Sequence, residues 1–207
     1  MKKATVVLLV LIGALCAMAL SCASSGGGKA ASSELGTGTL AIGEWRPYDD
    51  QEGNDGSSTS ELTEAEEVID GQTVKTYTVK GNITTKYQYG FAGWAIDPDE
   101  ETFERFKKAT GFSFKILGDG QRYTIKYKTT DCQMDHCYYE YGFNTEAGEV
   151  VYVEVPIKMF MQPSWGQWKR LNQNNVFGVE WQTHENWRKS TTTNPFEIKI
   201  WDFKVYN

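Results

Sequence analysis

The stretch GDGQRYTIKYKTTDCQMDHCYYEYGF, residues 118–143, decides the fold class. A glycine turn opens it, and a short loop bounded by Cys132 and Cys137 divides it into two alternating halves. Every second position in each half is apolar: Tyr123, Ile125 and Tyr127, then Tyr139, Tyr141 and Phe143. Because side chains of a strand point alternately to its two faces, this period of two predicts two half-buried β-strands. We expect these six side chains in a core, so that a ligand meets only the opposite face or the loops.

Comparable stripes lie on both sides of this stretch. Apolar residues recur at alternate positions in four further runs, residues 112–116, 151–157, 177–181 and 196–200. One helix is predicted from capping signals, with Asp97 as its cap and Pro98 in its first turn. Many short strands, one helix and no regular alternation of strands with helices predict an all-β domain, a β-sandwich over residues 40–207.

The chain before this helix raises two more expectations. Alternation over residues 73–80, and again after Gly81 and Asn82, predicts a hairpin that turns at this Gly-Asn pair. Residues 49–67 hold eight acidic side chains and no basic one, among glycine, serine and threonine. We expect this segment to be a mobile, solvent-exposed loop. A calcium-binding loop is the alternative, although the regular ligand spacing of a calcium hand is absent.

The N-terminus has the pattern of a secretory signal. Two lysines precede an apolar run over residues 4–20, and small Ser21 stands before Cys22. The tetrapeptide Ala-Leu-Ser-Cys that ends at Cys22 resembles a bacterial lipobox, which implies that residues 1–21 are removed and that Cys22 carries lipid. An uncleaved transmembrane helix is the alternative, but the apolar run is short for a membrane span. Residues 22–39 are rich in Gly, Ser and Ala and predict a flexible tether.

This signal predicts a location and a redox state. The chain is expected to be lipid-anchored at the bacterial cell envelope. Ala23, which follows the lipid-carrying cysteine, lacks the aspartate that resembles an inner-membrane retention signal, and this favours the outer membrane. Exported proteins live in an oxidising compartment, so Cys132 and Cys137 are expected to form a disulfide. A metal pair with His136 is the alternative, which the scarcity of further ligands disfavours.

The charge of the chain limits its partners. The chain has 21 basic and 27 acidic residues, and loss of the signal with its two lysines leaves 19 basic residues against 27 acidic ones, a net charge of −8. An acidic balance argues against nucleic acid as a partner and against electrostatic docking on anionic lipid.

Three segments carry a resemblance to a known class of domain. They are FERFKKATGFSFKILGDGQRYTIKYKT (residues 103–129), VEVPIKMFMQPSWGQ (153–167) and NPFEIKIWDFKVYN (194–207). Together they resemble jelly-roll domains of the galactose-binding-like class, both the complex I intermediate-associated type and the family 11 carbohydrate-binding modules. The resemblance covers residues 74–207. It implies a jelly-roll sandwich, preceded here by the signal and the tether, and it bears on fold more than on function.

No pattern of a catalytic site stands out. The sequence lacks the G-x-S-x-G, H-E-x-x-H, phosphate-loop and dinucleotide motifs, and neither of its two histidines has an obvious serine or cysteine partner. The resemblance implies room for one structural calcium, with Asp202 and either Glu44 or Asp97 as partners. We assign no metal ligand and expect no other cofactor.

The tryptophans favour a binding function. The chain has seven, and two of them lie in the loop 163–168. A sugar ring offers an apolar face to an indole and hydroxyl groups to polar side chains. We therefore predict stacking by Trp165, Trp168 or Trp187, with hydrogen bonds from Arg122, Gln182 and His184. If their strands are neighbours, one outward face gathers Arg122, Lys126, Tyr138, Glu140, Glu180, Gln182 and His184 into a groove.

Three functions remain open at this point. We favour a non-catalytic lipoprotein that displays its jelly-roll domain at the cell envelope and binds a glycan or polysaccharide. The alternative is a protein-interaction or envelope-assembly lipoprotein that uses the same sandwich to hold an envelope protein. A glycoside-active enzyme is the third, because an acidic chain always offers pairs of carboxylates. Membrane contact is expected through the lipid anchor, and nucleic acid is not expected.

Overall fold

The computed structural model describes residues 35, 37–132, 137–183 and 193–207. Its strands are β1 Thr39–Leu40, β2 Gly43–Asp49, β3 Thr59–Ile69, β4 Gln72–Thr84, β5 Ala92–Pro98, β6 Gly111–Leu117, β7 Arg122–Thr129, β8 Tyr139–Asn144, β9 Val150–Pro156, β10 Val176–Thr183 and β11 Thr193–Tyr206. Its helices are α1 Glu100–Phe106 and two single 3₁₀ turns, η2 Ile157–Met159 and η3 Gln173–Asn175.

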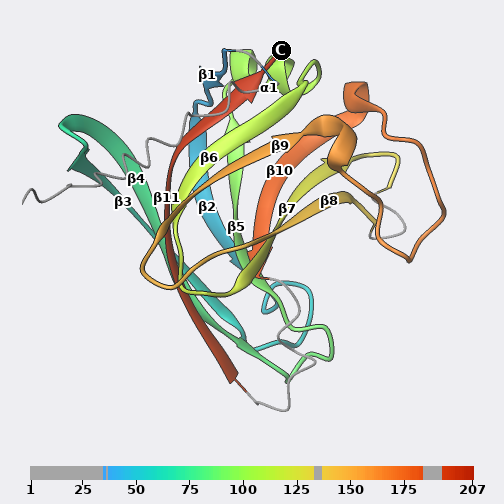
Figure 1. Ribbon diagram of the computed structural model, residues 1–207. Coiled ribbons are helices and arrows are strands. Elements are labelled where there is room, and N and C mark those ends of the chain that lie inside the picture. Colours follow the sequence, from blue (N-terminus) through green and yellow to red (C-terminus); the bar gives the residue numbers. More distant parts are fainter. Residues whose placement is uncertain (1–34, 36, 133–136, 184–192) are drawn as a thin grey trace, which may run out of the picture. The chain divides into compact units, whose positions relative to one another are not determined.

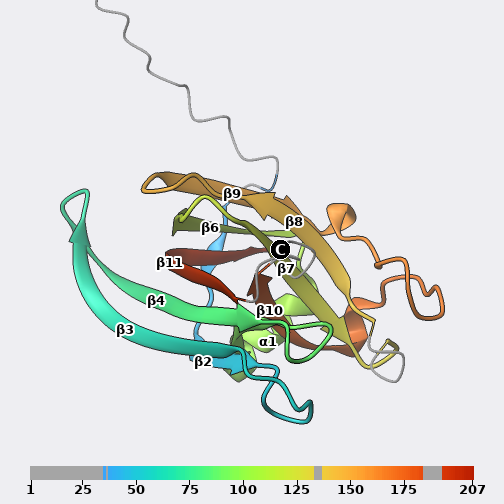
Figure 2. The ribbon, with the colours of Figure 1, turned by 90° about the horizontal axis from the view of Figure 1, so that it is seen from below.

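Two antiparallel sheets form a jelly-roll sandwich, as predicted (Figures 1 and 2). Sheet A has the strand order β3–β4–β11–β6–β9, and β1 pairs with β11 off this path. Sheet B has the order β2–β5–β10–β7–β8. Successive strands often lie in different sheets, so the chain crosses repeatedly from one layer to the other. Alternation along each strand therefore gives every strand one face toward the shared core.

The core between the sheets is aromatic. Its largest fully buried side chains are Trp94, Trp181, Tyr123, Tyr127, Phe106, Phe112, Phe114 and Phe203. The ring of Trp181 stacks on Trp94 at 5.9 Å and on Trp45 at 5.1 Å, and Phe203 meets it edge-on at 4.9 Å. Burial of one such ring contributes about 4–6 kcal/mol before the entropy of ordering is subtracted. Because Phe203 belongs to sheet A and Trp181 to sheet B, these contacts tie the two layers together.

The alternating aromatics of residues 118–143 lie in this core. Tyr123 and Tyr127 are fully buried, Tyr139 is nearly so, and Tyr141 packs against the core while partly exposed. Three hydroxyls donate to acceptors at the rim: Tyr123 to Asp119 Oδ2 (2.7 Å), Tyr127 to the carbonyl of Phe106 (2.5 Å) and Tyr139 to the carbonyl of Lys169 (3.1 Å). The prediction from period two is confirmed for these strands.

The predicted loop over residues 49–67 is wrong in its second half. Only residues 50–58 connect strands, because β3 begins at Thr59 and forms one edge of sheet A. The acidic residues lie in a strand because lysines face them: Lys75 pairs with Glu64 (2.5 Å), Lys80 with Glu61 (3.5 Å) and Lys199 with Glu67 (2.6 Å). Two of these lysines come from β4 and one from β11, so composition of the segment alone could not reveal them.

The hairpin turns at a different place from the predicted one. Strand β4 runs unbroken through Gly81, and the turn that precedes it is Asp70–Gly71. Both turn residues have positive φ, 52° and 76°, as a two-residue hairpin turn of type I′ requires. Gly81 is required for another reason, since a side chain there would collide with the carbonyl oxygen of Thr59 on β3.

Helix α1 begins later than predicted. Its cap is Asp99, whose Oδ1 accepts a hydrogen bond from the backbone N–H of Thr102 at 2.8 Å. Pro98 ends β5, and the Asp97 carboxylate instead binds Arg46 at 2.7 Å. A second aspartate two residues further on therefore takes the capping role.

One residue of the predicted stripe 177–181 faces the other way. The register of β10 against β7 shifts between Val176 and Gly178, which is a β-bulge. Val176 is buried as a result, and Phe177 is 38% exposed. The bulge therefore moves an aromatic side chain out of the core and onto the outer face of sheet B.

Several predicted features lie outside the described residues, among them the signal over residues 1–21, Cys22, His136, His184 and Trp187. Cys132 and Cys137 form the predicted disulfide, with their Cα atoms 4.9 Å apart. Within the described part of the chain, no helix has both the length and the apolar character needed to span a membrane.

Candidate functional site on the outer face of sheet B

Two rows of side chains cross sheet B on the side away from the core. The strand registers place one residue of each strand in each row. The first row is Arg46, Ala95, Glu180, Lys126 and Glu140, and the second is Tyr48, Gly93, Gln182, Thr124 and Gly142. We call these rows, with Arg122 and Tyr138, the polar face. Its β5 positions carry small residues, so the long polar side chains of β7 and β10 dominate its surface.

Lys126 is the most enclosed charged group of the polar face. Its side chain is 7% exposed, its ammonium donates to Gln182 Oε1, and its Nζ lies 4.0 Å from the centre of the Tyr138 ring. Register places Glu180 on one side of it and Glu140 on the other. Burial lowers the pKa of Lys126 to about 8, and the two glutamates limit the drop.

Two ion pairs lie on and beside the polar face. Lys128 Nζ lies 2.7 Å from Glu180 Oε1 and 5.2 Å from the centre of the Phe177 ring. Arg46 binds Asp97 at 2.7 Å. These pairs leave the face polar but close to balanced in charge, which favours ligands recognised through hydroxyl groups over strongly charged ones.

Tyr48 lies at the β2 edge of the polar face. Its hydroxyl donates to the carbonyl of Trp181 at 3.2 Å and lies 3.5 Å from Gln182 Oε1. Burial raises the pKa of this phenol well above its usual value. Gln182 Oε1 therefore accepts from the Lys126 ammonium while lying within reach of the Tyr48 hydroxyl, and this fixes the orientation of the amide at the centre of the face.

Aromatic rings border the polar face at its β8 edge. Tyr138 covers Lys126, and the ring of Trp165 meets Tyr138 edge-on at 5.8 Å. Tyr138 directly follows Cys137, so the disulfide fixes the backbone that positions it. The segment after η2 lies along β8 through two hydrogen bonds between Met161 and Glu140, of 2.8 and 2.9 Å. Trp165 is thereby held beside the polar face.

The predicted site residues divide into three groups. Gln182 and Arg122 lie on the polar face, and a side chain in place of Gly142 would collide with the guanidinium of Arg122. Trp165 reaches the face through Tyr138, whereas Trp168 is 78% exposed on the far part of its loop. Trp187 and His184 lie outside the described residues.

Arg46 and Tyr48 were not predicted as site residues. Strand β2 pairs with β5, so it is the fifth strand of sheet B and contributes its outward side chains to the polar face. The Trp45-Arg46-Pro47-Tyr48 run does alternate, with Trp45 buried in the core. This alternation was the signal that could have placed Tyr48 and Arg46 on one outward surface.

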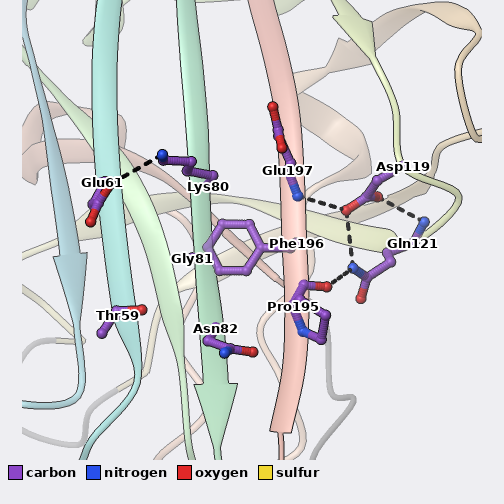
Figure 3. Close-up of a pocket in the computed structure, with 10 residues that line it drawn as sticks. All are labelled: Thr59, Glu61, Lys80, Gly81, Asn82, Asp119, Gln121, Pro195, Phe196 and Glu197. Carbon is purple, nitrogen blue, oxygen red and sulfur yellow. Dashed lines mark hydrogen bonds and ion pairs between the residues drawn. The ribbon is translucent and has the colours of Figure 1, made fainter.

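A separate hollow of about 480 Å³ lies on the outer face of sheet A (Figure 3). It is lined by Thr59, Glu61, Lys80, Gly81, Asn82, Asp119, Gln121, Pro195, Phe196 and Glu197. Asp119 accepts a hydrogen bond from the backbone N–H of Glu197 at 3.2 Å, and Gln121 donates to the carbonyl of Pro195 at 2.7 Å. These two side chains form hydrogen bonds with backbone groups of β11 that lie beyond the end of its pairing with β6. They therefore have a structural role.

Two of the three groups considered for calcium, Asp202 and Asp97, have lysine or arginine partners. Asp202 lies 3.2 Å from Lys204 and 4.0 Å from Lys115, and Asp97 binds Arg46. In the part of the chain that the structure describes, no three His, Cys, Asp or Glu side chains gather as a metal site would need.

Comparison with known proteins places this fold among recognised domains. The solved structure of the family 11 carbohydrate-binding module from the cellulosomal cellulase Lic26A-Cel5E of Clostridium thermocellum is 16% identical and superposes with a TM-score of 0.53. The match covers 83% of this chain and 95% of that one. An exo-β-agarase structure is 8% identical, with a TM-score of 0.48 over 82% of this chain and 26% of that one. None of the curated proteins matches the chain in sequence.

The family model for complex I intermediate-associated protein 30 (CIA30) matches residues 36–200. This range starts near the first described residues and ends within β11, so it spans nearly all of both sheets. The resemblance inferred from the three sequence segments is thereby confirmed. The chain belongs to the complex I intermediate-associated protein 30 (CIA30) family.

Proposed function

We propose that the polar face of sheet B binds carbohydrate. The observation that carries this proposal is the arrangement around Lys126, whose enclosed ammonium contacts the Gln182 amide and the ring of Tyr138 and whose neighbours in the row are Glu180 and Glu140. Sugars need this combination, because their hydroxyls both donate and accept while their ring faces are apolar. The shared fold of a family 11 carbohydrate-binding module supports the proposal.

The proposed roles follow from position. Tyr138 and Trp165 stack on sugar rings at the β8 edge, since their rings border the face. Gln182 and Arg122 hydrogen-bond to hydroxyl groups along the second row. Lys126 orients Gln182 and Tyr138, because it contacts both.

We propose that this binding is not accompanied by cleavage. The chain has no zinc, serine-nucleophile or phosphate-loop motif. Glu180 and Glu140 flank Lys126 in their row, and Glu180 binds Lys128, so they are not the unpaired, facing carboxylates that a glycosidase uses. A screen of chromogenic glycosides and of reducing-end release from polysaccharides tests this point, and turnover above that of a Glu180→Gln variant would contradict it.

We also propose that the domain is displayed at the bacterial cell envelope, with the outer membrane favoured, on a lipid carried by Cys22. The sequence basis is the signal pattern over residues 1–21 and the tether that follows. Growth with a radiolabelled fatty acid tests it: label is expected in the chain and absent from a Cys22→Ser variant, and equal labelling of both would contradict the assignment.

Binding is tested with a panel of soluble polysaccharides by affinity electrophoresis, followed by calorimetry on the ligands retained. Tyr138→Ala and Gln182→Ala are each expected to weaken binding by about tenfold or more. Tyr152→Ala is the matched control, because Tyr152 is an exposed tyrosine on β9 of the other sheet. Equal affinity in all variants would contradict the polar face as the site.

Membership of a family named for association with an assembly intermediate favours a second candidate, a protein partner held at the same sandwich. Chemical crosslinking of the chain in envelopes, followed by mass spectrometry, tests this candidate. A stoichiometric partner whose crosslinks map to the polar face, in a chain that binds no polysaccharide, would favour it over carbohydrate.

A further inference from the structure

The segment over residues 157–172 differs in charge from the rest of the chain. No acidic residue occurs between Glu154 and Glu180, although the whole chain has 27 of them. The same interval contains Lys158, Lys169 and Arg170. All charged residues of this stretch are therefore basic, although the protein as a whole has a net negative charge. The overall charge of the sequence does not reveal this local difference.

Large apolar side chains of this segment lie in solvent. The exposed fractions are 49% for Met159, 71% for Met161, 45% for Trp165 and 78% for Trp168. Among the described residues, Trp168 is the most exposed large hydrophobic side chain. Figures 1 and 2 both show the segment after η2 projecting from the sandwich beyond β8. Exposed tryptophan and methionine among basic side chains form a surface typical of contact with a membrane interface.

The projecting segment has a defined conformation. The Gln162 side chain bridges its two ends, donating to the carbonyl of Gln167 at 2.9 Å and accepting from the backbone N–H of Lys169 at 2.8 Å. Met161 is fixed to β8 by its hydrogen bonds with Glu140. The exposed rings are therefore presented on a closed loop, and little further ordering is needed when they contact another surface.

Leu35 lies beside the start of this segment. Leu35 lines a small hollow together with Ala109, Pro156, Ile157 and Lys158. Its side chain lies so close to Gly111 that a Cβ atom there would collide with it. Twelve residues lie between Cys22 and Leu35 in the sequence, and a Gly- and Ser-rich linker of that length has an end-to-end reach of about 20 Å. If Cys22 carries lipid, as proposed above, a linker of this length would bring the segment within reach of the lipid surface.

We propose that residues 157–172 contact the surface of an anionic phospholipid bilayer and so orient the sandwich on the membrane. Lys158, Lys169 and Arg170 attract the anionic headgroups, and Met161 and Trp168 enter the interface. Trp165, which packs on Tyr138, lies at the boundary between this surface and the polar face. The contact thus differs from the lipid anchor, and it assigns Trp168 to lipid instead of to sugar.

The test uses the full chain, purified from membranes and reconstituted into vesicles of phosphatidylethanolamine with phosphatidylglycerol that contain brominated phospholipid. Bromine quenches tryptophan fluorescence at short range, so part of the emission is expected to be lost. The loss is expected to fall at least threefold in Trp168→Phe, and to disappear in phosphatidylcholine vesicles or at high salt. Quenching that is the same in Trp168→Phe, or that ignores the anionic lipid, would overturn the proposal.

A charge-matched pair of variants sharpens the result. Replacement of Lys158, Lys169 and Arg170 by glutamine is expected to remove the quenching, whereas replacement of Lys75, Lys80 and Lys86 by glutamine is expected to preserve it. Both variants lose three positive charges, but the second set lies on β4 and in the loop after it. Equal loss in both would show a general charge effect and overturn the proposal. Polysaccharide affinity of Trp168→Phe is expected to be unchanged; a loss of affinity without quenching would assign Trp168 to the sugar site instead.

Discussion

The ammonium of Lys126 lies 4.0 Å from the centre of the Tyr138 ring, on the outer face of sheet B. This contact joins a strand of the sheet to the residue that follows the disulfide, and Trp165 extends it to the neighbouring loop. Cation–π contacts of an enclosed lysine contribute about 1–2 kcal/mol. The same contact holds the aromatic ring in the position where it can stack on a ligand.

Replacement of Lys126 is expected to weaken binding with little effect on stability. Lys126→Met keeps most of the side-chain volume and removes an enclosed charge, so at pH 7 the free energy of unfolding is expected to change by no more than about 1 kcal/mol. Polysaccharide affinity is expected to fall at least tenfold, because Gln182 and Tyr138 lose the group that orients them. Chemical denaturation and calorimetry on the same sample check both values. Loss of stability with unchanged affinity would show that Lys126 has only a structural role.

The enclosed lysine also predicts a pH dependence of stability. Burial lowers the pKa of Lys126 from its ordinary value of 10.5 to about 8, so between these pH values the unfolded chain binds more protons than the folded one. The free energy of unfolding therefore rises with pH across this window, by up to about 3 kcal/mol from this group. Urea denaturation from pH 7.5 to 10 is expected to show the rise in the native chain and to lack it in Lys126→Met. Parallel curves for the two chains would contradict the lowered pKa.

The turn between β3 and β4 predicts a cost for a side chain at Gly71. Its φ of 76° lies in the left-handed region, so Gly71→Ala is expected to lower the free energy of unfolding by about 1 kcal/mol. Gly178→Ala is the matched control: φ there is not in that region and a Cβ atom would contact nothing, so it is expected to be neutral or slightly stabilising. An equal effect of both replacements would count against the turn assignment.

The disulfide predicts a linked effect on stability and on the site. Replacement of both Cys132 and Cys137 by serine opens a small loop and is expected to cost roughly 2 kcal/mol in the chain-entropy account. Because Tyr138 follows directly, polysaccharide affinity is expected to fall as well, and treatment of the native chain with a reductant is expected to reproduce both effects. Unchanged affinity in the serine variant would show that Tyr138 is positioned without the disulfide.

Local alternation was enough to predict the sandwich, but pairing between distant strands was not. Tyr123, Tyr127 and Tyr139 were placed in the core because the period of two is a local property of each strand. The loop prediction for residues 49–67 failed because the lysines that neutralise β3 come from β4 and β11. The Gly81-Asn82 pair that was predicted as a turn lies inside β4, where Gly81 allows the close approach of Thr59, and only the pairing of the strands reveals this.

The candidate site was also predicted only where local alternation along a strand was informative. Lys126, Glu140, Glu180 and Gln182 were grouped on the condition that β10, β7 and β8 are neighbours, and the registers meet that condition. Tyr48 was missed because β2 joins the sheet through β5, far along the chain. Phe177 was placed in the core because a β-bulge leaves no signature in simple alternation.

The most direct measurement is a crystal structure of the chain with an oligosaccharide cut from a polysaccharide that it binds. The account predicts sugar density over the polar face, with a ring stacked on Tyr138 and hydroxyl groups within hydrogen-bonding distance of Gln182 and Arg122. Density in the hollow of sheet A beside Glu61 and Asn82, or on Trp168 alone, would contradict it.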